Sequence, residues 1–344
     1  MSKPQKILLI YTGGTIGMVT NPETGGLYPI DFDHILQQVP ELNRLGIEMD
    51  SITFNPVIDS SDMNPKTWEK LATIIGDKYH KYDGFVILHG TDTMSYTASA
   101  LSFMLQNLSK PVILTGSQLP IGLIRTDAKE NLITAIEIAA AHEDGNAIVP
   151  EVAIYFETKL YRGNRTTKHN AEYFNAFSSD NYPPLAKAGI KIHYNREYIF
   201  KACKQDFAIK TKMDTNVLIL RIFPGMTIQM LQSICSTPGL RGIVLETYGS
   251  GNAPTNPEFI KVLEEATTRG IIIVNVSQCR AGSVNMSSYE AGMGLLKAGI
   301  ISGFDSTTEA ALTKLMFLLA NCPDKNLVIE NLKKSLRGEI NTHL

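Results

Sequence analysis

The segment KILLIYTGGTIG, residues 6–17, carries the pattern on which the fold depends. Its first half, Lys6–Tyr11, is a short apolar run, and its second half is a turn rich in glycine and threonine. A strand that is apolar on both faces is typical of a parallel sheet covered by helices. Ligands of such sheets bind outside the carboxyl ends of the strands. The segment therefore predicts a buried parallel strand that leads into a binding site.

Short apolar runs alternate with longer helical patterns along the rest of the chain. In the first half, the further predicted strands are Ile52–Val57, Phe85–His89, Pro111–Thr115 and Val152–Phe156, and the predicted helices are Asn64–His80, Thr93–Leu108 and Asp127–His142. In the second half, the predicted strands are Asn216–Ile222, Gly242–Glu246 and Gly270–Val276, and the predicted helices are Asn256–Arg269, Ser288–Ala298 and Ser306–Ala320. Residues 161–184 are polar and irregular, which predicts a functional or mobile loop. This alternation indicates an α/β protein.

The chain of 344 residues is long enough for two domains at about 150 residues each. Residues 193–213 are polar and show little periodicity, so we place the boundary there. The sequence predicts a larger N-terminal α/β domain over residues 1–198, a linker over 199–213, and a smaller C-terminal α/β domain over 214–344.

The composition excludes several classes of protein. Apolar residues make up 44% and charged residues 19%, which argues against a disordered chain. The formal net charge is −2, and no cluster of lysine and arginine indicates a nucleic-acid partner. The four cysteines lie far apart and predict reduced thiols rather than a zinc or redox motif. With no signal-like or membrane-spanning segment, we expect a cytoplasmic protein without a membrane partner.

Polar groups follow the ends of four predicted strands. The segments are TGGTIG at Thr12–Gly17, LHGTDTM at Leu88–Met94, LTGSQ at Leu114–Gln118 and DSSD at Asp59–Asp62. Together they offer hydroxyls, carboxylates and free backbone N–H groups, which suits a small ligand that carries both an amine and a carboxylate. Taken singly, each segment has an ordinary turn or a helix cap as its alternative interpretation.

A fifth polar segment, YRGNRTTK at Tyr161–Lys168, lies in the irregular stretch. A threonine hydroxyl is barely ionised at neutral pH and needs help to act as a nucleophile. A lysine held near a second threonine and an aspartate could relay a proton if its pKa were lowered. The alternative interpretation is a solvated cationic loop.

Other catalytic and binding motifs do not occur in the sequence. There is no G-x-G-x-x-G or P-loop pattern in residues 12–17, no H-E-x-x-H among the seven histidines, and no G-x-S-x-G. His89 is the last residue of a predicted strand, where a packed histidine is at least as good an interpretation as a functional one.

The segments TGGTIG and HGTDTM, at residues 12–17 and 89–94, resemble the two signature segments of bacterial-type L-asparaginases. The segments DSSDM, TGSQ, YRGNRTTK and YGSGNAP, the last at residues 248–254, resemble the cytoplasmic type I branch of this family. The resemblance extends over the whole chain. It implies hydrolysis of L-asparagine to L-aspartate and ammonia, without a metal or other cofactor.

The resemblance also implies roles for individual residues. Thr15 matches the family nucleophile, which forms an acyl-enzyme. Tyr28 matches a tyrosine on a flexible N-terminal loop close to that hydroxyl, and the preceding residues 18–27 carry Gly25 and Gly26, as expected of a mobile lid. The residues that bind substrate and activate Thr15 or water are Thr91, Asp92 and Lys168. The residues that hold the α-amino and α-carboxylate groups of the substrate are Asp59, Ser60 and Ser61. Asn252 matches a residue contributed by a neighbouring subunit.

The family fold implies a homotetramer assembled as a dimer of dimers, with active sites at the dimer interface. Glu290 lies near the place of another cross-subunit residue, but the local spacing differs and we assign it no role. Some type I enzymes bind asparagine at a second, regulatory site, in segments that here contain Cys279, Thr166 and Thr167. Glu246 stands where a cation would be expected, which argues against such a site.

Two alternatives of other classes remain at this point. The ammonia-releasing component of the archaeal tRNA-dependent amidotransferase uses the same domain, but it carries an additional N-terminal domain, and Thr15 lies too near the start of this chain for one. A two-domain binding protein of periplasmic type would fit the α/β halves, but it would not need Thr15, Thr91, Asp92 and Lys168. The preference for asparagine or glutamine stays open, because one methylene changes binding by only about 1–3 kcal/mol.

Overall fold

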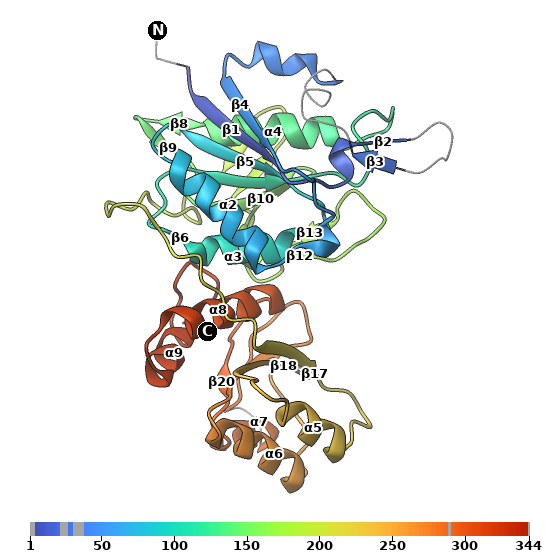
Figure 1. Ribbon diagram of the computed structural model, residues 1–344, viewed down its shortest axis with the longest axis vertical. Helices are drawn as coiled ribbons and strands as arrows, with labels where there is room; N and C mark the ends of the chain where they lie inside the picture. Colours follow the sequence, from blue (N-terminus) through green and yellow to red (C-terminus); the bar gives the residue numbers. More distant parts are fainter. Residues whose placement is uncertain (1–3, 21–26, 30–37, 288–289, 343–344) are drawn as a thin grey trace. The chain divides into compact units, whose positions relative to one another are not determined.

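The computed structural model describes residues 4–20, 27–29, 38–287 and 290–342. The chain divides into two compact units, Met1–Thr211 and Lys212–Leu344. Each unit consists of helices packed on its own sheet (Figure 1). The predicted fold class, two α/β domains with the larger one first, is confirmed.

The sheet of the first unit has eight strands in the order β15-β14-β11-β10-β7-β5-β1-β4. Their bounds are β1 Lys6–Tyr11, β4 Glu48–Thr53, β5 Gly84–Leu88, β7 Val112–Thr115, β10 Val152–Phe156, β11 Lys159–Arg162, β14 Ala186–Ala188 and β15 Ile192–Tyr194. Neighbours from β4 to β10 are parallel, whereas β11, β14 and β15 are joined antiparallel. The parallel part carries the strand ends that the sequence singles out.

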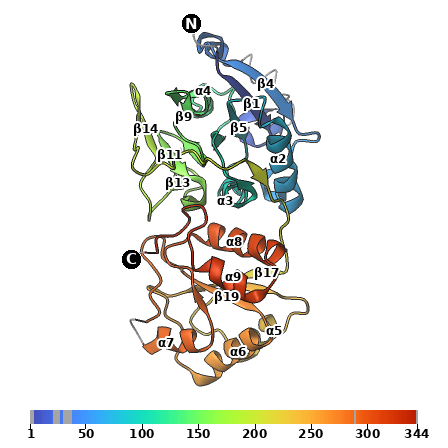
Figure 2. The same cartoon turned by 90° about the vertical axis from the view of Figure 1, so that its left-hand side faces the viewer.

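Helices cover both faces of this sheet. They are α2 Pro65–Lys78, α3 Met94–Met104 and α4 Ala128–Ala140. Ile7, Leu9 and Tyr11 of β1 join one core cluster with the apolar face of α4. Because side chains alternate along a strand, Leu8 and Ile10 point to the other face, where Figure 2 shows α2 and α3. All five side chains are buried, as the apolar run predicts.

The second unit has a four-stranded parallel sheet in the order β17-β18-β19-β20. Its strands are β17 Val217–Arg221, β18 Gly242–Thr247, β19 Ile272–Ser277 and β20 Ile301–Ser302, and its helices are α5 Ile228–Cys235, α6 Pro257–Thr268, α7 Glu290–Lys297, α8 Thr308–Asn321 and α9 Lys325–Leu332. Apolar side chains of α5 and α6 pack on one face of the sheet. The four cysteines of the chain are free thiols, as predicted.

Short elements complete the description: β2 Met18–Thr20, β3 Leu27–Pro29, β6 Leu105–Gln106, β8 His142–Glu143, β9 Asn146–Ala147, β12 Thr167–Lys168, β13 Phe177–Ser178, β16 Ala208–Ile209, η1 Thr15–Gly17, η2 Pro40–Arg44, η3 Ser60–Asp62 and η4 Gly163–Arg165.

Two expectations were wrong. The strand predicted at 52–57 lies at 48–53, since the chain leaves the sheet before Pro56, although Phe54 still packs into the core. The stretch 161–184, predicted to be irregular, contains parts of β11 and all of η4, β12 and β13.

Candidate active site

The strand ends predicted to form a site do lie side by side. β1 pairs with both β4 and β5, and β5 pairs with β7, all in parallel. Thr12, directly after β1, joins its two neighbours: its N–H and hydroxyl donate to the Leu88 carbonyl at 3.0 and 2.9 Å. Its own carbonyl accepts from the Ile58 N–H at 2.7 Å. These bonds fix the start of the glycine-rich turn.

Glycines let the backbones of three polar segments touch. Gly13 and Gly14 have φ of 137° and 93°, a region that side chains rarely tolerate. A Cβ at Gly14 would lie 2.5 Å from the Gly90 backbone, and a Cβ at Gly90 would lie 2.6 Å from the Ser60 hydroxyl oxygen. Since both distances are far below van der Waals contact, the close approach requires glycine. The turn that carries Thr15 therefore meets the segments of Gly90 and Ser60.

Lys168 reaches back to the segment after β5. Its Nζ donates to Thr91 Oγ1 at 2.8 Å and lies 2.6 Å from Asp92 Oδ1. The lysine side chain is only 16% exposed, whereas that of Asp92 is 67% exposed. Antiparallel pairing of β12 with β13 holds Lys168 in place. The structure thus brings together three residues that the sequence separates by up to 77 positions.

Gln118 is a contact that sequence reasoning did not single out. Its Oε1 accepts from Thr91 Oγ1 at 3.2 Å, and its Nε2 donates to the Tyr173 carbonyl at 3.2 Å. With Lys168 donating to the same hydroxyl, Gln118 determines where the hydrogen of Thr91 points. Its position at the end of the TGSQ segment was the available signal.

Asp59 and the two serines after it form a compact turn in front of η3. Asp59 Oδ1 accepts from both the N–H and the hydroxyl of Ser61, each at 2.8 Å. These bonds hold the pKa of Asp59 below its usual value, so the carboxylate is ionised at neutral pH. Ser60 is buried, with its side chain against Gly90. The turn can offer a carboxylate to an amine.

The remaining predicted residues lie elsewhere or are only partly described. Thr15 begins η1, directly after Gly14. Tyr28 is in β3, opposite Val19 of β2, whereas the lid glycines Gly25 and Gly26 lie outside the described residues. Asn252 belongs to the second unit, where its backbone bonds to that of Tyr248.

His89 is a packed histidine. It is fully buried, and its Nδ1 lies 2.6 Å from the Gly90 carbonyl. Because a carbonyl only accepts, Nδ1 carries the hydrogen, and Nε2 accepts from the Thr97 hydroxyl at 2.9 Å. That hydroxyl in turn accepts from Trp68 Nε1 at 3.0 Å. Burial lowers the pKa of His89 to about 4, so the ring is neutral at pH 7.

Glu246 makes two side-chain contacts within the second unit. Its Oε1 accepts from the Thr308 hydroxyl at 2.6 Å, and its Oε2 lies 3.5 Å from Arg221. A carboxylate in this position would repel the carboxylate of an amino acid.

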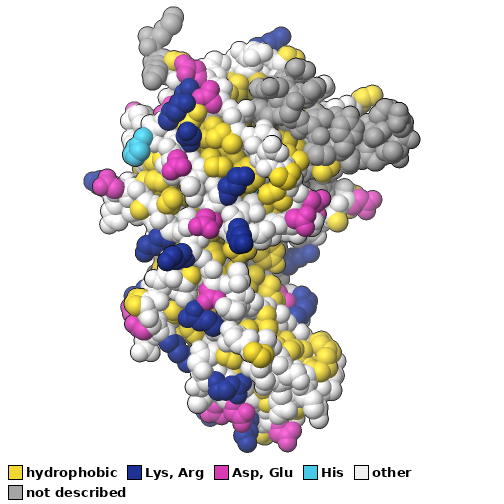
Figure 3. Space-filling model, in the orientation of Figure 1, with side chains coloured by type: hydrophobic (Ala, Val, Ile, Leu, Met, Phe, Trp, Pro, Cys, Tyr) yellow, Lys and Arg dark blue, Asp and Glu magenta, His cyan; other side chains and the backbone are white. Residues whose placement is uncertain are grey.

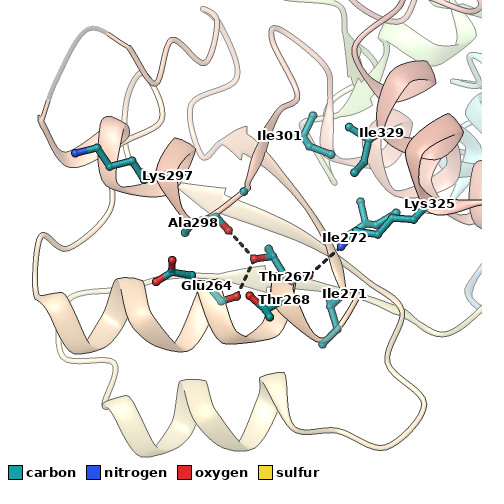
Figure 4. A pocket seen from close by; sticks show the side chains of 11 residues that line it. Glu264, Thr267, Thr268, Ile271, Ile272, Lys297, Ala298, Ile301, Lys325 and Ile329 are labelled. Atoms are coloured by element: carbon teal, nitrogen blue, oxygen red, sulfur yellow. Dashed lines mark hydrogen bonds between the residues drawn. The ribbon is translucent and has the colours of Figure 1, made fainter.

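A pocket of the second unit and the charges on one face of the molecule can be compared with the predicted site residues. A pocket of about 290 Å³ in the second unit is lined by residues such as Glu264, Thr267 and Lys325 (Figure 4), and none of the predicted site residues lines it. On the face that Figure 3 shows, acidic and basic side chains are interspersed. Among the described residues, no group of three or more His, Cys, Asp or Glu side chains could hold a metal, and no helix is long and apolar enough to cross a membrane.

Comparison with known proteins relates this arrangement to a family. The family model for the N-terminal domain of asparaginases matches residues 6–200, and that for the C-terminal domain of glutaminases and asparaginases matches residues 216–330. L-asparaginase 1 of Escherichia coli (strain K12) is 43% identical over 342 residues, with 98% of each chain covered. A component of the glutamyl-tRNA(Gln) amidotransferase of Pyrococcus horikoshii is 34% identical, covering 97% of this chain and 76% of that one.

A solved structure agrees with both family models. L-asparaginase I from Vibrio cholerae superimposes with a TM-score of 0.90 and 40% identity, covering 98% of this chain and 100% of that one. Since the two family models match in order and cover most of the sequence, the chain belongs to the asparaginase family of amidohydrolases.

Proposed function

We propose that this protein is a type I L-asparaginase, which hydrolyses L-asparagine to L-aspartate and ammonia. The observation that carries the proposal is the placement of Lys168 Nζ between Thr91 Oγ1 and Asp92 Oδ1. Thr91 follows Gly90, whose backbone meets Gly14, the residue before Thr15. The names of the Escherichia coli and Vibrio cholerae relatives support the same substrate.

In the proposed reaction, Thr15 Oγ attacks the side-chain amide carbon of asparagine, and an ester bond forms as the C–N bond breaks. The proton of the Thr15 hydroxyl goes to the leaving nitrogen, which departs as ammonia. Water then cleaves the acyl-enzyme and yields aspartate. The ammonium group of Lys168, beside Thr91 and Asp92, favours negative charge on oxygen atoms during these steps.

The proposed residues are those of the sequence prediction. The catalytic residues are Thr15, Tyr28, Thr91, Asp92 and Lys168, and the substrate-binding residues are Asp59, Ser60, Ser61, Thr91, Asp92 and Asn252. The ionised carboxylate of Asp59 suits the α-amino group of the substrate. Asn252, in the second unit, is proposed to act from a neighbouring subunit of a homotetramer, and the protein is proposed to be cytoplasmic.

Steady-state release of ammonia tests the proposal, with asparagine and glutamine as separate substrates and no tRNA or partner protein present. We expect turnover of asparagine, loss of it in Thr15→Ala, and partial activity in Thr15→Ser, which keeps a hydroxyl. Wild-type turnover in Thr15→Ala would exclude Thr15 as the nucleophile. Tight binding of asparagine without ammonia would indicate a binding protein. A sigmoidal dependence on asparagine would indicate a regulatory site despite Glu246.

The amidotransferase relative supplies a second candidate, a protein that releases ammonia for transfer to charged tRNA. Ammonia release from free asparagine in the isolated protein separates the two, because the second candidate would need its partner and tRNA.

A further inference from the structure

Two helices of the first unit begin without the usual side-chain cap. An N-cap side chain normally accepts a hydrogen bond from a backbone N–H in the first turn of its helix. Where the structure describes an α-helix N-cap, the side chains that do so are Asn64, Thr227, Asn256, Thr307 and Asp324. Thr93 of α3 and Asp127 of α4 make no such bond, although threonine and aspartate are good caps. Both helices start at the candidate active site.

Thr93 uses its hydroxyl to hold the substrate-binding turn. Its Oγ1 donates to the Ser60 carbonyl at 2.6 Å. On the other side of the same peptide, the Ser61 N–H donates to Asp59 Oδ1 at 2.8 Å. Because the peptide unit is planar, bonds at both its C=O and its N–H fix its orientation. Thr93 therefore sets how Ser60 and Ser61 face a ligand.

Asp127 uses its carboxylate in the same way on the loop after β7. It accepts from the N–H groups of Gln118 and Leu119, at 3.0 and 3.2 Å. Gln118 in turn accepts the hydrogen of the Thr91 hydroxyl. Through this loop, Asp127 acts on Thr91 without touching it.

A neighbouring residue supplies the cap that α4 lacks. Thr126 Oγ1 accepts from the N–H of Ala128, the first residue of the helix, at 3.0 Å. The carboxylate of Asp127 is thereby available to the loop.

We propose that Thr93 and Asp127 are positioning residues of the active site, whose side chains orient the Ser60–Ser61 peptide and Gln118 rather than cap their helices. The proposal rests on the function proposed above. Loss of the Thr93 hydroxyl should raise the KM for asparagine, because the Ser60–Ser61 peptide loses one of the two bonds that fix its orientation. Loss of an ordinary N-cap hydroxyl should lower the stability and leave KM unchanged.

The test compares Thr93→Val with Thr227→Val, since Thr227 is an ordinary N-cap of α5 that accepts from the Met230 N–H at 3.2 Å. We expect Thr93→Val to raise the KM for asparagine roughly 3–10-fold, with kcat within about twofold. Its Tm should fall by no more than about 2–4 °C, because the bond to the Ser60 carbonyl is lost. Thr227→Val should lower Tm by about 2–4 °C with KM unchanged. Thr93→Ser keeps the donor and should bring KM back to within about twofold of wild type.

Asp127→Asn extends the test to the second helix. Oδ1 of Asp127 accepts from both N–H groups, at 3.1 and 3.2 Å, so an amide oxygen can still meet them. The NH2 group that replaces Oδ2, however, opposes the Gln118 N–H, which lies 3.0 Å from Oδ2 in the wild type, and the negative charge is lost. Because Gln118 orients Thr91, we expect kcat to fall by roughly tenfold while KM changes by less than about threefold.

The outcomes separate this inference from the proposed function. If the wild-type protein releases no ammonia from asparagine, the proposed function fails before any variant is compared. If the wild type is active but Thr93→Val lowers Tm like Thr227→Val and leaves KM unchanged, Thr93 is an ordinary cap and the inference is overturned. A KM that stays raised in Thr93→Ser would also overturn it, since the donor is then irrelevant.

Discussion

Lowering the pH from 7 to 5 should destabilise the first unit through one buried histidine. His89 donates from Nδ1 to the Gly90 carbonyl and accepts at Nε2 from Thr97. Thr97 also accepts from Trp68, so its own hydrogen is committed to His89. A proton added at Nε2 would oppose that hydroxyl hydrogen in a site without access to water. The network therefore favours the neutral ring.

The size of the effect follows from the difference between two pKa values. Burial lowers the pKa of His89 from 6.5 to about 4 in the folded protein, while the unfolded chain keeps the ordinary value. Between these values, the unfolded chain binds a proton that the folded chain does not, so the free energy of unfolding falls as the pH falls. At about 1.4 kcal/mol per pH unit, the loss at pH 5 is about 2 kcal/mol.

Trp68 is the one tryptophan of the sequence, so its emission reports unfolding within this network. Urea unfolding followed by tryptophan fluorescence should be measured at several pH values for wild type and for His89→Asn. Asparagine keeps a donor for the Gly90 carbonyl but does not titrate in this range. The difference between the two free energies of unfolding should change by about 2 kcal/mol from pH 7 to pH 5. The same pH dependence in both proteins would refute the reasoning, since every other titrating group is shared.

Three further predictions follow from contacts in the structure. Gly90→Ala places a methyl group 2.6 Å from the Ser60 hydroxyl oxygen, so the backbone must move, and kcat/KM should fall by about 100-fold. Ser61→Ala removes a hydroxyl that lowers the pKa of Asp59; since ionised Asp59 is lost as the pH falls through its pKa, the acid limb of kcat/KM should move to higher pH. Glu339→Gln leaves the buried ammonium group of Lys314, in α8, without its counter-charge. The free energy of unfolding of the second unit, measured with urea and circular dichroism, should therefore fall by about 3 kcal/mol.

Each of these predictions has a result that contradicts it. Unchanged kcat/KM in Gly90→Ala would mean that the contact with Ser60 relaxes freely. An acid limb that stays in place in Ser61→Ala would mean that Asp59 does not control activity in that range. Unfolding of Glu339→Gln at the wild-type urea concentration would mean that the ammonium finds water or another partner.

The regular parts of the fold could be predicted from the sequence because buried strands are short, apolar and bounded by turns. β1 and β10 have the predicted bounds, and α2 begins with the predicted Asn64 cap and Pro65. The edge strand β4 was misplaced because it is half exposed, so its apolar residues do not form a continuous run. β20 has only two residues in the ladder, too few for any pattern.

The candidate site could be predicted in part, for a topological reason. Polar groups after neighbouring parallel strands must share one edge of the sheet, so Thr12 and Thr91 could be grouped without a structure. The segment YRGNRTTK suggested its lysine, Lys168, as a proton relay, but the grouping of Lys168 with Thr91 and Asp92 came from the resemblance, because no spacing rule joins residues so far apart. The roles of Gln118 and Thr93 were not visible, since a threonine before a helical pattern indicates an N-cap whether or not its hydroxyl turns away from the helix.

Several departures from local rules in the first unit lie at the candidate site. Gly13 and Gly14 adopt positive φ where their turn meets the Gly90 segment, Thr93 leaves the side-chain cap of α3 unmade, and the cap of α4 comes from Thr126 rather than Asp127. The unmade cap of α3 forgoes about 1 kcal/mol of helix stability. That loss is noticeable beside the roughly 5–15 kcal/mol by which the native state of a protein is more stable than its unfolded state. Local preference and global fold normally agree, and real proteins break that agreement at functional sites. The pattern of broken rules is thus an argument for the site that is independent of the sequence motifs, because it would stand even if no relative were known.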